Sequence, residues 1–248
     1  MTLKIKFTKE VCMFFKYKPQ NYPGYLVVID GTDGSGKETQ TKLLAERLEK
    51  EGLKAKIVDF PQYGKKSAGS VEEYLNGKYG DADTVGPWKG SIFYALDRYS
   101  ASFEIRKLLK EGYIILSNRY VAANMGHQGG KIKNILKRKF FFKWLYWLEY
   151  KFFHIPFPDL NIILHVEASI GQKLVDKKNA RDYVSGKKRD IHEADLNHLK
   201  KAEKIYLEIP KSLPGFTLIE CTENNTILSR EKIHEMVYKT LKQKLDFL

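Results

Sequence analysis

Short apolar segments alternate along this chain with longer segments in which apolar residues recur every three or four positions. The short segments are rich in Val, Ile and Leu without polar alternation, which is typical of strands buried on both faces. They predict strands at 25–30, 54–59, 113–117, 160–166 and 216–220. The periodic segments predict helices at about 37–51, 87–111, 134–153, 169–179, 192–209 and 229–245.

Strands separated by helix-length segments indicate parallel crossover connections. We therefore expect an α/β fold of three layers, with a five-stranded parallel sheet flanked by helices. Ligands of such sheets bind outside the carboxyl ends of the strands. The segments that follow the strands are 31–37, 60–66, 118–130 and 167–168, and we expect them to be the loops of the functional site. The chain shows no internal repeat or low-complexity linker, so we expect one domain over 24–248, preceded by an extension of unassigned role over 1–23.

Composition is that of an ordinary globular protein, with 43% hydrophobic and 29% charged residues among 248. Cys12 and Cys221 form neither a disulfide framework nor a metal-binding spacing, so we expect reduced thiols in a cytoplasmic protein. No apolar run approaches the roughly 20 residues that a membrane span needs. Residues 1–20 lack the Arg and Ser enrichment and the small-residue cleavage site of targeting peptides.

The net charge of +13 suggests anionic partners, such as nucleotides, nucleic acids or acidic membranes. The positive charge gathers in three regions, 1–20, 131–151 and 173–189. Within the second region, aromatic and basic residues interleave over 139–153, which would suit a membrane-surface helix or a nucleic-acid platform. Its apolar residues instead recur at helical spacing, which favours a core or dimer-interface helix: Phe141, Trp144, Leu145, Leu148 and Phe152.

The most informative motif lies between the first predicted strand and the first predicted helix. Its glycines allow the backbone to wrap around an anion, its N–H groups can point at phosphate oxygens, and Lys37 adds a full positive charge. Strand, glycine-rich turn and helix together are the context of a P-loop that binds a nucleoside triphosphate. The candidate ATP-binding residues here are Gly31, Thr32, Asp33, Gly34, Ser35, Gly36, Lys37, Glu38 and Thr39.

One residue departs from the P-loop pattern. Glu38 stands where Ser or Thr usually contacts Mg²⁺, and Thr39 comes one position late, where it should point elsewhere around the helix. A carboxylate is a hard oxygen ligand, so Glu38 is a candidate ligand of Mg²⁺, directly or through water. An acidic residue is also favoured in the first turn of any helix, and both interpretations stay open.

Further motifs follow the other strands in a fixed order. They are Phe60-Pro61, the helical series from Phe93 to Tyr99, Asn118-Arg119-Tyr120 with Asn124 and Gln128, Pro158-Asp159-Leu160, and a basic loop from Lys177 to Asp190. Together with the P-loop, this ordered series resembles the thymidylate kinase family over about residues 24–245. The resemblance implies a P-loop kinase fold with a basic lid at about 176–191, and transfer of the γ-phosphate of ATP to dTMP with Mg²⁺ as cofactor, in a homodimer without stable nucleic-acid binding.

The resemblance also assigns residues to the second substrate. It implies that Tyr94 stacks on thymine, that Arg98 bonds an exocyclic oxygen of the base, and that Arg119 contacts the acceptor phosphate. Tyr94 and Arg98 are four residues apart, which places them on one helix face; Asp97 could pair with Arg98 locally. The expected dTMP-binding residues are Asp33, Phe60, Tyr94, Arg98, Arg119, Asn124 and Gln128.

Members of the family carry an additional catalytic arginine either in the P-loop or in the lid. Gly34 occupies the P-loop position here, so we expect the lid to supply the charge from Arg181, Lys187, Lys188 or Arg189. Arg181 is our first choice, since a guanidinium can contact two phosphate oxygens at once. The expected catalytic residues are Lys37, Asp33, Arg181 and Arg119, and Arg181 is also expected to bind ATP.

Two more departures from the family pattern leave alternatives open. Asn118 replaces an aspartate, which loses a charge near Mg²⁺, and Gln62 follows Phe60-Pro61 where many members carry an arginine. Either Lys65 or Lys66 substitutes for that arginine, or Arg119 alone binds the acceptor phosphate. The competing functions are another deoxynucleotide or deoxynucleoside kinase, a nucleotide-binding protein without turnover, and a nucleic-acid-binding protein.

Overall fold

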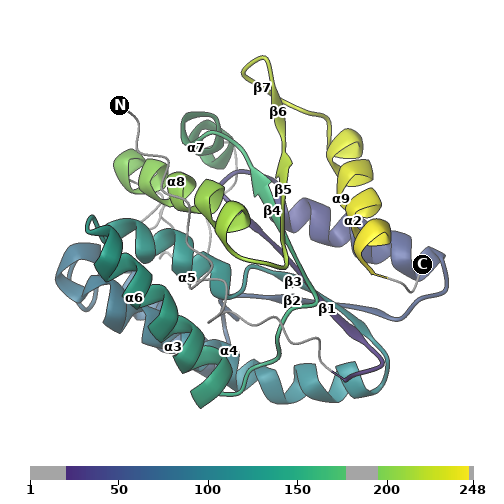
Figure 1. The fold of residues 1–248 in the computed structure, drawn as a ribbon, viewed down its shortest axis with the longest axis horizontal. Coiled ribbons are helices and arrows are strands. Elements are labelled where there is room, and N and C mark those ends of the chain that lie inside the picture. Colours follow the sequence, from purple (N-terminus) through teal and green to yellow (C-terminus); the bar gives the residue numbers. More distant parts are fainter. Residues whose placement is uncertain (1–20, 177–194, 246–248) are drawn as a thin grey trace.

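The structure, a computed structural model, describes residues 21–176 and 195–245. Its main sheet has five parallel strands in the order β2-β3-β1-β4-β5 (Figure 1). These strands confirm the five predicted from sequence: β1 Tyr25–Gly31, β2 Ala55–Asp59, β3 Ile114–Asn118, β4 Leu160–His165 and β5 Phe216–Glu220. The extension over 1–20 and most of the expected lid lie outside the described residues.

Alternate side chains of β1 point to opposite faces of the sheet, and each set enters a different core. Val27 and Ile29 pack in the core beneath α2 (Lys37–Lys50) and α9 (Arg230–Lys244). Leu26 and Val28 pack in the core on the other face, against α4 (Ala82–Lys110). Burial on both faces explains why the strand sequences lack polar alternation.

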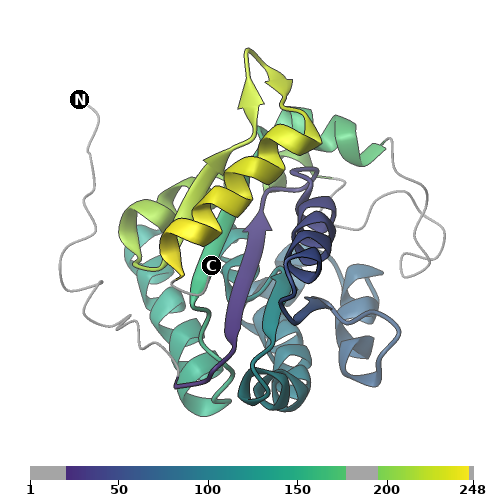
Figure 2. The same ribbon diagram turned by 90° about the vertical axis from the view of Figure 1, so that its right-hand side faces the viewer.

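The helices complete a three-layer arrangement. Figure 2 shows α9 and α2 on one side of the sheet, whereas the other side is covered by α4, α5, α6 and α8. The remaining described helices are α3 Gly69–Leu75, α5 Val121–His127, α6 Ile135–Tyr146, α7 Ala168–Asp176 and α8 Leu196–Ser212, with short 3-10 turns at Lys66–Ala68 and Gly129–Lys131. The fold class predicted from sequence is confirmed.

Several elements differ from the sequence prediction. The segment 118–130, expected to be a loop, contains α5, and α3 was not predicted. α4 begins at Ala82, but Gly86 has φ 74° and breaks its helical geometry immediately before Pro87. The predicted start at 87 is therefore where the long helix resumes. A small antiparallel hairpin of β6 (Thr222–Glu223) and β7 (Thr226–Ile227) projects from the end of β5 (Figure 1).

The aromatic and basic segment is an inward-packing helix whose end changes geometry. α6 begins after Asn134, whose side chain accepts a hydrogen bond from the Lys137 N–H, and a π-helical turn follows at Trp147–Phe152. Phe141, Leu145 and Leu148 are buried as predicted, but Phe152 is exposed. No helix in the described ranges is long and apolar enough to cross a membrane.

Candidate active site

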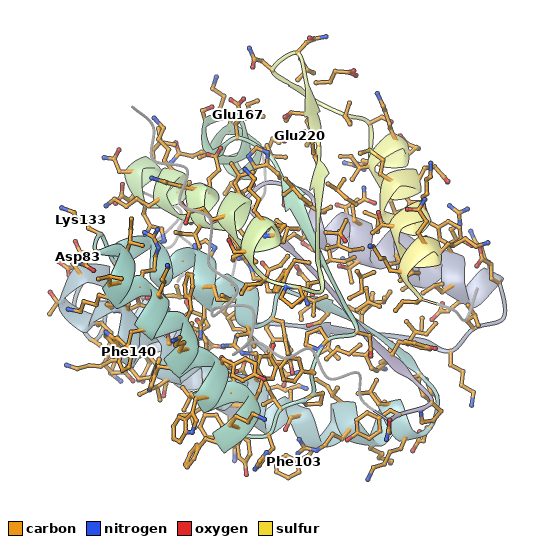
Figure 3. All side chains as sticks on the ribbon, in the orientation of Figure 1. Asp83, Phe103, Lys133, Phe140, Glu167 and Glu220 are labelled. Carbon is orange, nitrogen blue, oxygen red and sulfur yellow. The ribbon has the colours of Figure 1, made fainter. Side chains whose placement is uncertain are left out.

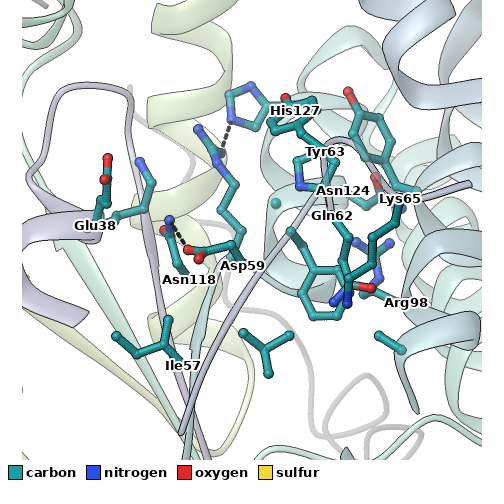
Figure 4. A pocket seen from close by; sticks show the side chains of 18 of the residues that line it. Glu38, Ile57, Asp59, Gln62, Tyr63, Lys65, Arg98, Asn118, Asn124 and His127 are labelled. Atoms are coloured by element: carbon teal, nitrogen blue, oxygen red, sulfur yellow. Dashed lines mark hydrogen bonds between the residues drawn. The ribbon is translucent and has the colours of Figure 1, made fainter. Parts of the chain in front are cut away.

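A cavity of about 780 Å³ lies at the carboxyl ends of the central strands. One end is lined by P-loop residues and Glu38, and the other by residues of α4 and α5 (Figure 4). The predicted residues that line it are Asp33, Gly34, Gly36, Lys37, Glu38, Phe60, Tyr94, Arg98, Arg119, Asn124 and Gln128. The fold thus brings predicted ATP-binding residues and predicted dTMP-binding residues to one cavity.

The P-loop is held in shape by its neighbours. Lys37 Nζ donates to the carbonyls of Gly31 at 3.2 Å and Thr32 at 2.8 Å, so the lysine side chain folds back onto the backbone of the loop. The hydroxyl of Thr32 donates to the Val166 carbonyl at 2.7 Å and accepts from the Val166 N–H at 3.1 Å, which fixes the loop to the end of β4. Gly31 has φ 139°, and a Cβ there would lie 2.0 Å from the Leu164 carbonyl oxygen.

Gly34 has no room for a side chain. Its φ is 79°, and a Cβ would lie 2.3 Å from the carbonyl oxygen of Gly171 in α7. A Cβ on Gly171 would in turn lie 2.1 Å from the Asp33 carbonyl oxygen. The P-loop and α7 therefore meet backbone to backbone, and an arginine could not occupy position 34 in this arrangement.

The candidate ligands of Mg²⁺ lie in the P-loop and at the start of α2. Glu38 is exposed, lines the cavity, and accepts a hydrogen bond from Lys42 Nζ at 2.8 Å. Thr39 is half-buried and does not line the cavity, as expected for a residue that points elsewhere. Ser35 Oγ is buried and has no hydrogen-bond partner within the described part of the chain. Glu38 and Ser35 therefore bring a carboxylate and a buried hydroxyl to this end, beside the carboxylates of Asp33 and Asp59 in the cavity wall.

Arg119 links the two ends of the cavity. Its backbone adopts φ 67°, its Nη2 donates to Asp33 Oδ1, and its Nη1 lies 3.1 Å from His127 Nε2. Burial raises the pKa of Asp33, but the neighbouring charges, of which that of Arg119 is the largest, together with the hydrogen bond from Arg119 outweigh it, so the pKa lies well below the usual value. Asp33 is therefore a fixed negative charge between Arg119 and Lys37, whose Nζ lies 3.9 Å away.

Tyr94 and Arg98 both line the cavity, as their spacing predicts. Arg98 is buried, and its Nε and Nη2 donate to Glu149 at 2.9 and 2.5 Å. Asp97 is not its hydrogen-bond partner, which corrects the local pairing expected from sequence. Glu149 is brought inward by the π-helical turn, and it fixes the plane of the guanidinium.

Asp97 instead anchors the loop after β2. Its carboxylate accepts from the Gln62 N–H at 2.8 Å and from Ser67 Oγ at 2.6 Å. This holds Phe60, which follows β2 with a cis peptide bond to Pro61, against the cavity wall. Lys65 lines the cavity and Lys66 does not, so Lys65 is the candidate to replace the missing arginine (Figure 4).

Amide side chains complete the wall. Asn118 Nδ2 donates to Asp59 Oδ1 at 2.9 Å, which places a carboxylate on the neighbouring strand beside the lost aspartate position (Figure 4). Asn124 Nδ2 donates to the Ser91 carbonyl at 3.2 Å. Gln128 accepts from Lys131 Nζ at 2.9 Å, while its buried Nε2 has no hydrogen-bond partner in the described ranges.

Some residues escaped the sequence analysis, and others cannot be placed. Asp59 and His127 line the cavity and contact Asn118 and Arg119, and Glu149 joins the site through its contact with Arg98. The one available signal was position, since Asp59 directly precedes Phe60-Pro61 and His127 directly precedes Gln128. Arg181, Lys187, Lys188 and Arg189 lie outside the described residues.

Known proteins are similar to this chain in sequence and in fold. It is 28% identical over 186 residues to thymidylate kinase from Mycobacterium tuberculosis, covering 74% of this chain and 85% of the relative. It is 26% identical over 225 residues to a probable thymidylate kinase from Pyrococcus abyssi, covering 90% and 98%. The solved structure of thymidylate kinase from Candida albicans matches with a TM-score of 0.67 at 21% identity, covering 90% of this chain and 93% of that one, which shows the fold.

The sequence model of the family described as "Thymidylate kinase" matches residues 29–243. This range contains the whole of the cavity wall described above, from the P-loop to α7. The chain belongs to the thymidylate kinase family.

Proposed function

We propose that this protein transfers the γ-phosphate of ATP to dTMP, giving dTDP and ADP. The observation that carries the proposal is the single cavity that joins a P-loop to the predicted acceptor residues. Lys37 lies at the P-loop end, Arg119 lies between the two ends, and Asp33 pairs with both. Two anionic reactants placed in this cavity would meet between two cations.

Phosphoryl transfer requires positioning and charge neutralisation more than covalent help. The P-loop and Lys37 hold the donor phosphates, and Arg119 holds the acceptor phosphate, with Lys65 at the rim. A phosphate oxygen of dTMP bonds to the γ-phosphorus as the bond to the bridging oxygen of ADP breaks. Asp33 is not the base for this step, because its pKa lies well below the usual value; it orients Lys37 and Arg119.

Magnesium fits the residues at the donor end. Mg²⁺ usually binds through one or two carboxylates together with substrate phosphates and water, so a preformed cluster of protein ligands is not required. Glu38 would provide a carboxylate at the cavity wall. When bound, the ion neutralises charge on the β- and γ-phosphates.

The base is read at the α4 and α5 side of the cavity. Tyr94 provides an aromatic face for stacking on thymine, and Arg98, whose plane Glu149 fixes, offers its remaining N–H groups to an exocyclic oxygen. Asn124 and Gln128 add amide groups, and the buried Nε2 of Gln128 is a hydrogen-bond donor in need of an acceptor. Phe60 closes the wall.

The lid would supply the last cation. Gly34 cannot carry a side chain against Gly171, which supports Arg181 as the residue that reaches the transferring phosphate. A guanidinium there would contact two phosphate oxygens and help exclude water, which competes as acceptor.

The active protein would be a homodimer in the cytoplasm. Ile92, Leu96, Tyr99 and Phe103 of α4 are spaced by four, three and four residues and are all exposed. They form an apolar stripe along one helix, a surface that can pack against its own copy about a two-fold axis. Figure 3 shows Phe103 at the lower edge of the molecule. Cys221 is a buried free thiol, in keeping with a reducing compartment.

An assay of ADP release with a panel of acceptors tests the function. With ATP and Mg²⁺, the protein should turn over dTMP with a kcat/KM at least about tenfold above dUMP, dCMP, dGMP and thymidine. A mismatched or lost polar contact costs about 1–3 kcal/mol, and so does the methyl group that dUMP lacks. Thymidine as the best acceptor would indicate a nucleoside kinase. Equal use of all four monophosphates would refute the base assignment, and no ADP release with any acceptor would indicate a binding protein without turnover.

A further inference from the structure

Two histidines form a hydrogen-bonded chain that ends on Arg119. Nη1 of Arg119 lies 3.1 Å from Nε2 of His127, and Nδ1 of His127 lies 3.3 Å from Nε2 of His198 (the first contact is dashed in Figure 4). The two imidazole rings are stacked, with centroids 5.6 Å apart and planes inclined by 22°. His127 belongs to α5 and His198 to the first turn of α8, so the chain connects the loop after β3 with two helices.

The guanidinium fixes the direction of every hydrogen bond in this chain. Arginine is always protonated and can only donate, so Nε2 of His127 must accept. His127 then carries its proton on Nδ1 and donates to Nε2 of His198, which must also accept. His198 in turn carries its proton on its own Nδ1. Both rings are therefore neutral, each in the Nδ1–H tautomer.

The surroundings of the rings agree with this assignment. Burial lowers the pKa of His127 well below 6.5, despite the opposing charge of Asp33, and burial lowers that of His198 to about 4. Within the described residues, the charged groups that act on the two rings include Asp33, Lys37, Arg119, Lys131, Asp195 and Lys201. Nε2 of His127 lies 3.9 Å from Asp33 Oδ2, which is too far for a hydrogen bond.

Arg119 is consequently held on two sides. Asp33 accepts from Nη2, His127 accepts from Nη1, and the remaining N–H groups of the planar fork are directed by these two contacts. The same helix that carries His198 also carries Tyr206, whose hydroxyl donates to Asp30 Oδ1 at 2.8 Å at the end of β1. α8 thus supports β1 through Tyr206 and Arg119 through His198 and His127.

We propose that His198, acting through His127, is a positioning residue that orients Arg119 for the phosphate of the acceptor nucleotide. The inference rests on the proposed function of Arg119. His127 lines the cavity, so replacing it would also change the wall of the site. His198 is 6% exposed and is not among the described residues of that wall, and its hydrogen bond to His127 connects it to Arg119.

The test compares the binding of dTMP with that of thymidine, which lacks the phosphate. In His198→Phe an aromatic ring remains but the acceptor nitrogen is lost, so Nδ1–H of His127 loses its hydrogen bond to His198. We expect dTMP binding to weaken by about tenfold while thymidine binding changes by less than about twofold. His198→Gln keeps an acceptor at this position and should recover most of the dTMP affinity.

Two further measurements separate positioning from a merely structural role. In an Arg119→Lys background, His198→Phe should cause no further loss of dTMP affinity, because the two changes act through one contact. In the ¹⁵N NMR spectrum of the unmodified protein, which does not depend on the folding of any variant, both histidines should show the Nδ1–H tautomer. An Nε2–H tautomer at His127, or an unchanged ratio of dTMP to thymidine affinity in His198→Phe, would overturn the proposal.

The controls keep this result distinct from the proposed function. If the unmodified protein does not prefer dTMP to thymidine, or if Arg119→Lys keeps the preference, the assignment of Arg119 fails. If Arg119→Lys loses the preference and His198→Phe keeps it, Arg119 has its proposed role and the histidine chain does not position it.

Discussion

Single side chains in this site take their charge state from the residues beside them. Asp33 stays ionised although it is buried, because Arg119 and other neighbouring charges stabilise the carboxylate, whereas the pKa values of His127 and His198 are low because burial outweighs the charges of Asp33 and, for His198, Asp195. Arg98 keeps its charge in the interior through Glu149. Each buried cation facing the cavity is thus held by a specific carboxylate, a costly arrangement that is typical of functional sites.

The histidine pair predicts a pH dependence of stability. The pKa of His198 is about 4 in the folded protein and 6.5 in the unfolded chain. The unfolded state therefore binds more protons between these values, so the stabilisation is complete above pH 6.5 and is lost as the pH falls to 4. A difference of this size is worth roughly 3 kcal/mol.

Urea unfolding at pH 7 and at pH 4.5 measures this effect. His198→Gln cannot titrate, so it should lose about 2 kcal/mol less than the unmodified protein between these two pH values. The pKa of His127 is also lowered by folding, but His127 is present in both proteins, so the comparison isolates the contribution of His198. Identical losses in the two proteins would contradict the low pKa of His198.

Glu38 and Lys42 allow a test of magnesium binding by paired substitutions. If Glu38 is a ligand, Glu38→Gln should raise the Mg²⁺ concentration for half-maximal activity by about tenfold, the size of effect seen when a ligand contact is lost. Lys42→Met removes the lysine that competes for the same carboxylate, so it should leave that concentration unchanged or lower it. Binding of Mg²⁺–ATP measured by calorimetry should follow the same order. Equal and small effects of both substitutions would show that Glu38 is only the partner of Lys42.

At the scale of helices and strands, local sequence predicted the five strands and the placing of two site residues on one helix. The five strands are short segments rich in Val, Ile and Leu, and Tyr94 and Arg98 share a helix face because they are four residues apart. α5 was missed because Asn124 and Gly126, poor helix formers, lie within its seven residues. Tertiary contacts, not propensity, support this short helix.

The partners of the buried site residues could not be predicted in the same way. Glu149 is 51 residues from Arg98 in sequence. It is buried in a π-helical turn, and the spacing of apolar residues in the sequence does not predict such a turn. The contact of Gly34 with Gly171 joins the P-loop to a helix more than a hundred residues later. Such pairings depend on how complete elements pack, so they appear only in three dimensions.

The contact between the P-loop and α7 gives a prediction at this scale. Gly34 and Gly36 both have positive φ, so alanine at either position costs about 1–2 kcal/mol in backbone strain. Only Gly34→Ala also places a Cβ against Gly171, whereas Gly36 has no atom within 4 Å of that position. Gly34→Ala should therefore be less stable than Gly36→Ala by a further 1–3 kcal/mol or so, the cost of overpacking. Thermal unfolding of the two variants measures the difference, and equal stability would show that α7 does not pack there.

At the scale of the whole molecule, α4 leaves a stripe of four large apolar residues exposed in the described ranges: Ile92, Leu96, Tyr99 and Phe103. Tyr99 contacts Phe103 and Phe153 in ring pairs, which extends the stripe toward the π-helical turn. Leu96→Glu combined with Phe103→Glu should place two charges in a buried interface and convert a dimer into a monomer. Light scattering after gel filtration measures the mass. Leu136→Glu, at an exposed apolar residue of α6 outside the stripe, is the control and should remain dimeric.

The central claim is that both nucleotides occupy one cavity and that phosphate passes directly between them. The most direct measurement follows the label of [γ-³²P]ATP in a reaction with dTMP and Mg²⁺, with the products separated by chromatography. The account predicts that the label appears in dTDP, and that Lys37→Ala and Arg119→Ala each reduce the rate by at least about a hundredfold. Label released as inorganic phosphate at the same rate with and without dTMP, or a dTDP yield that does not depend on Arg119, would contradict it.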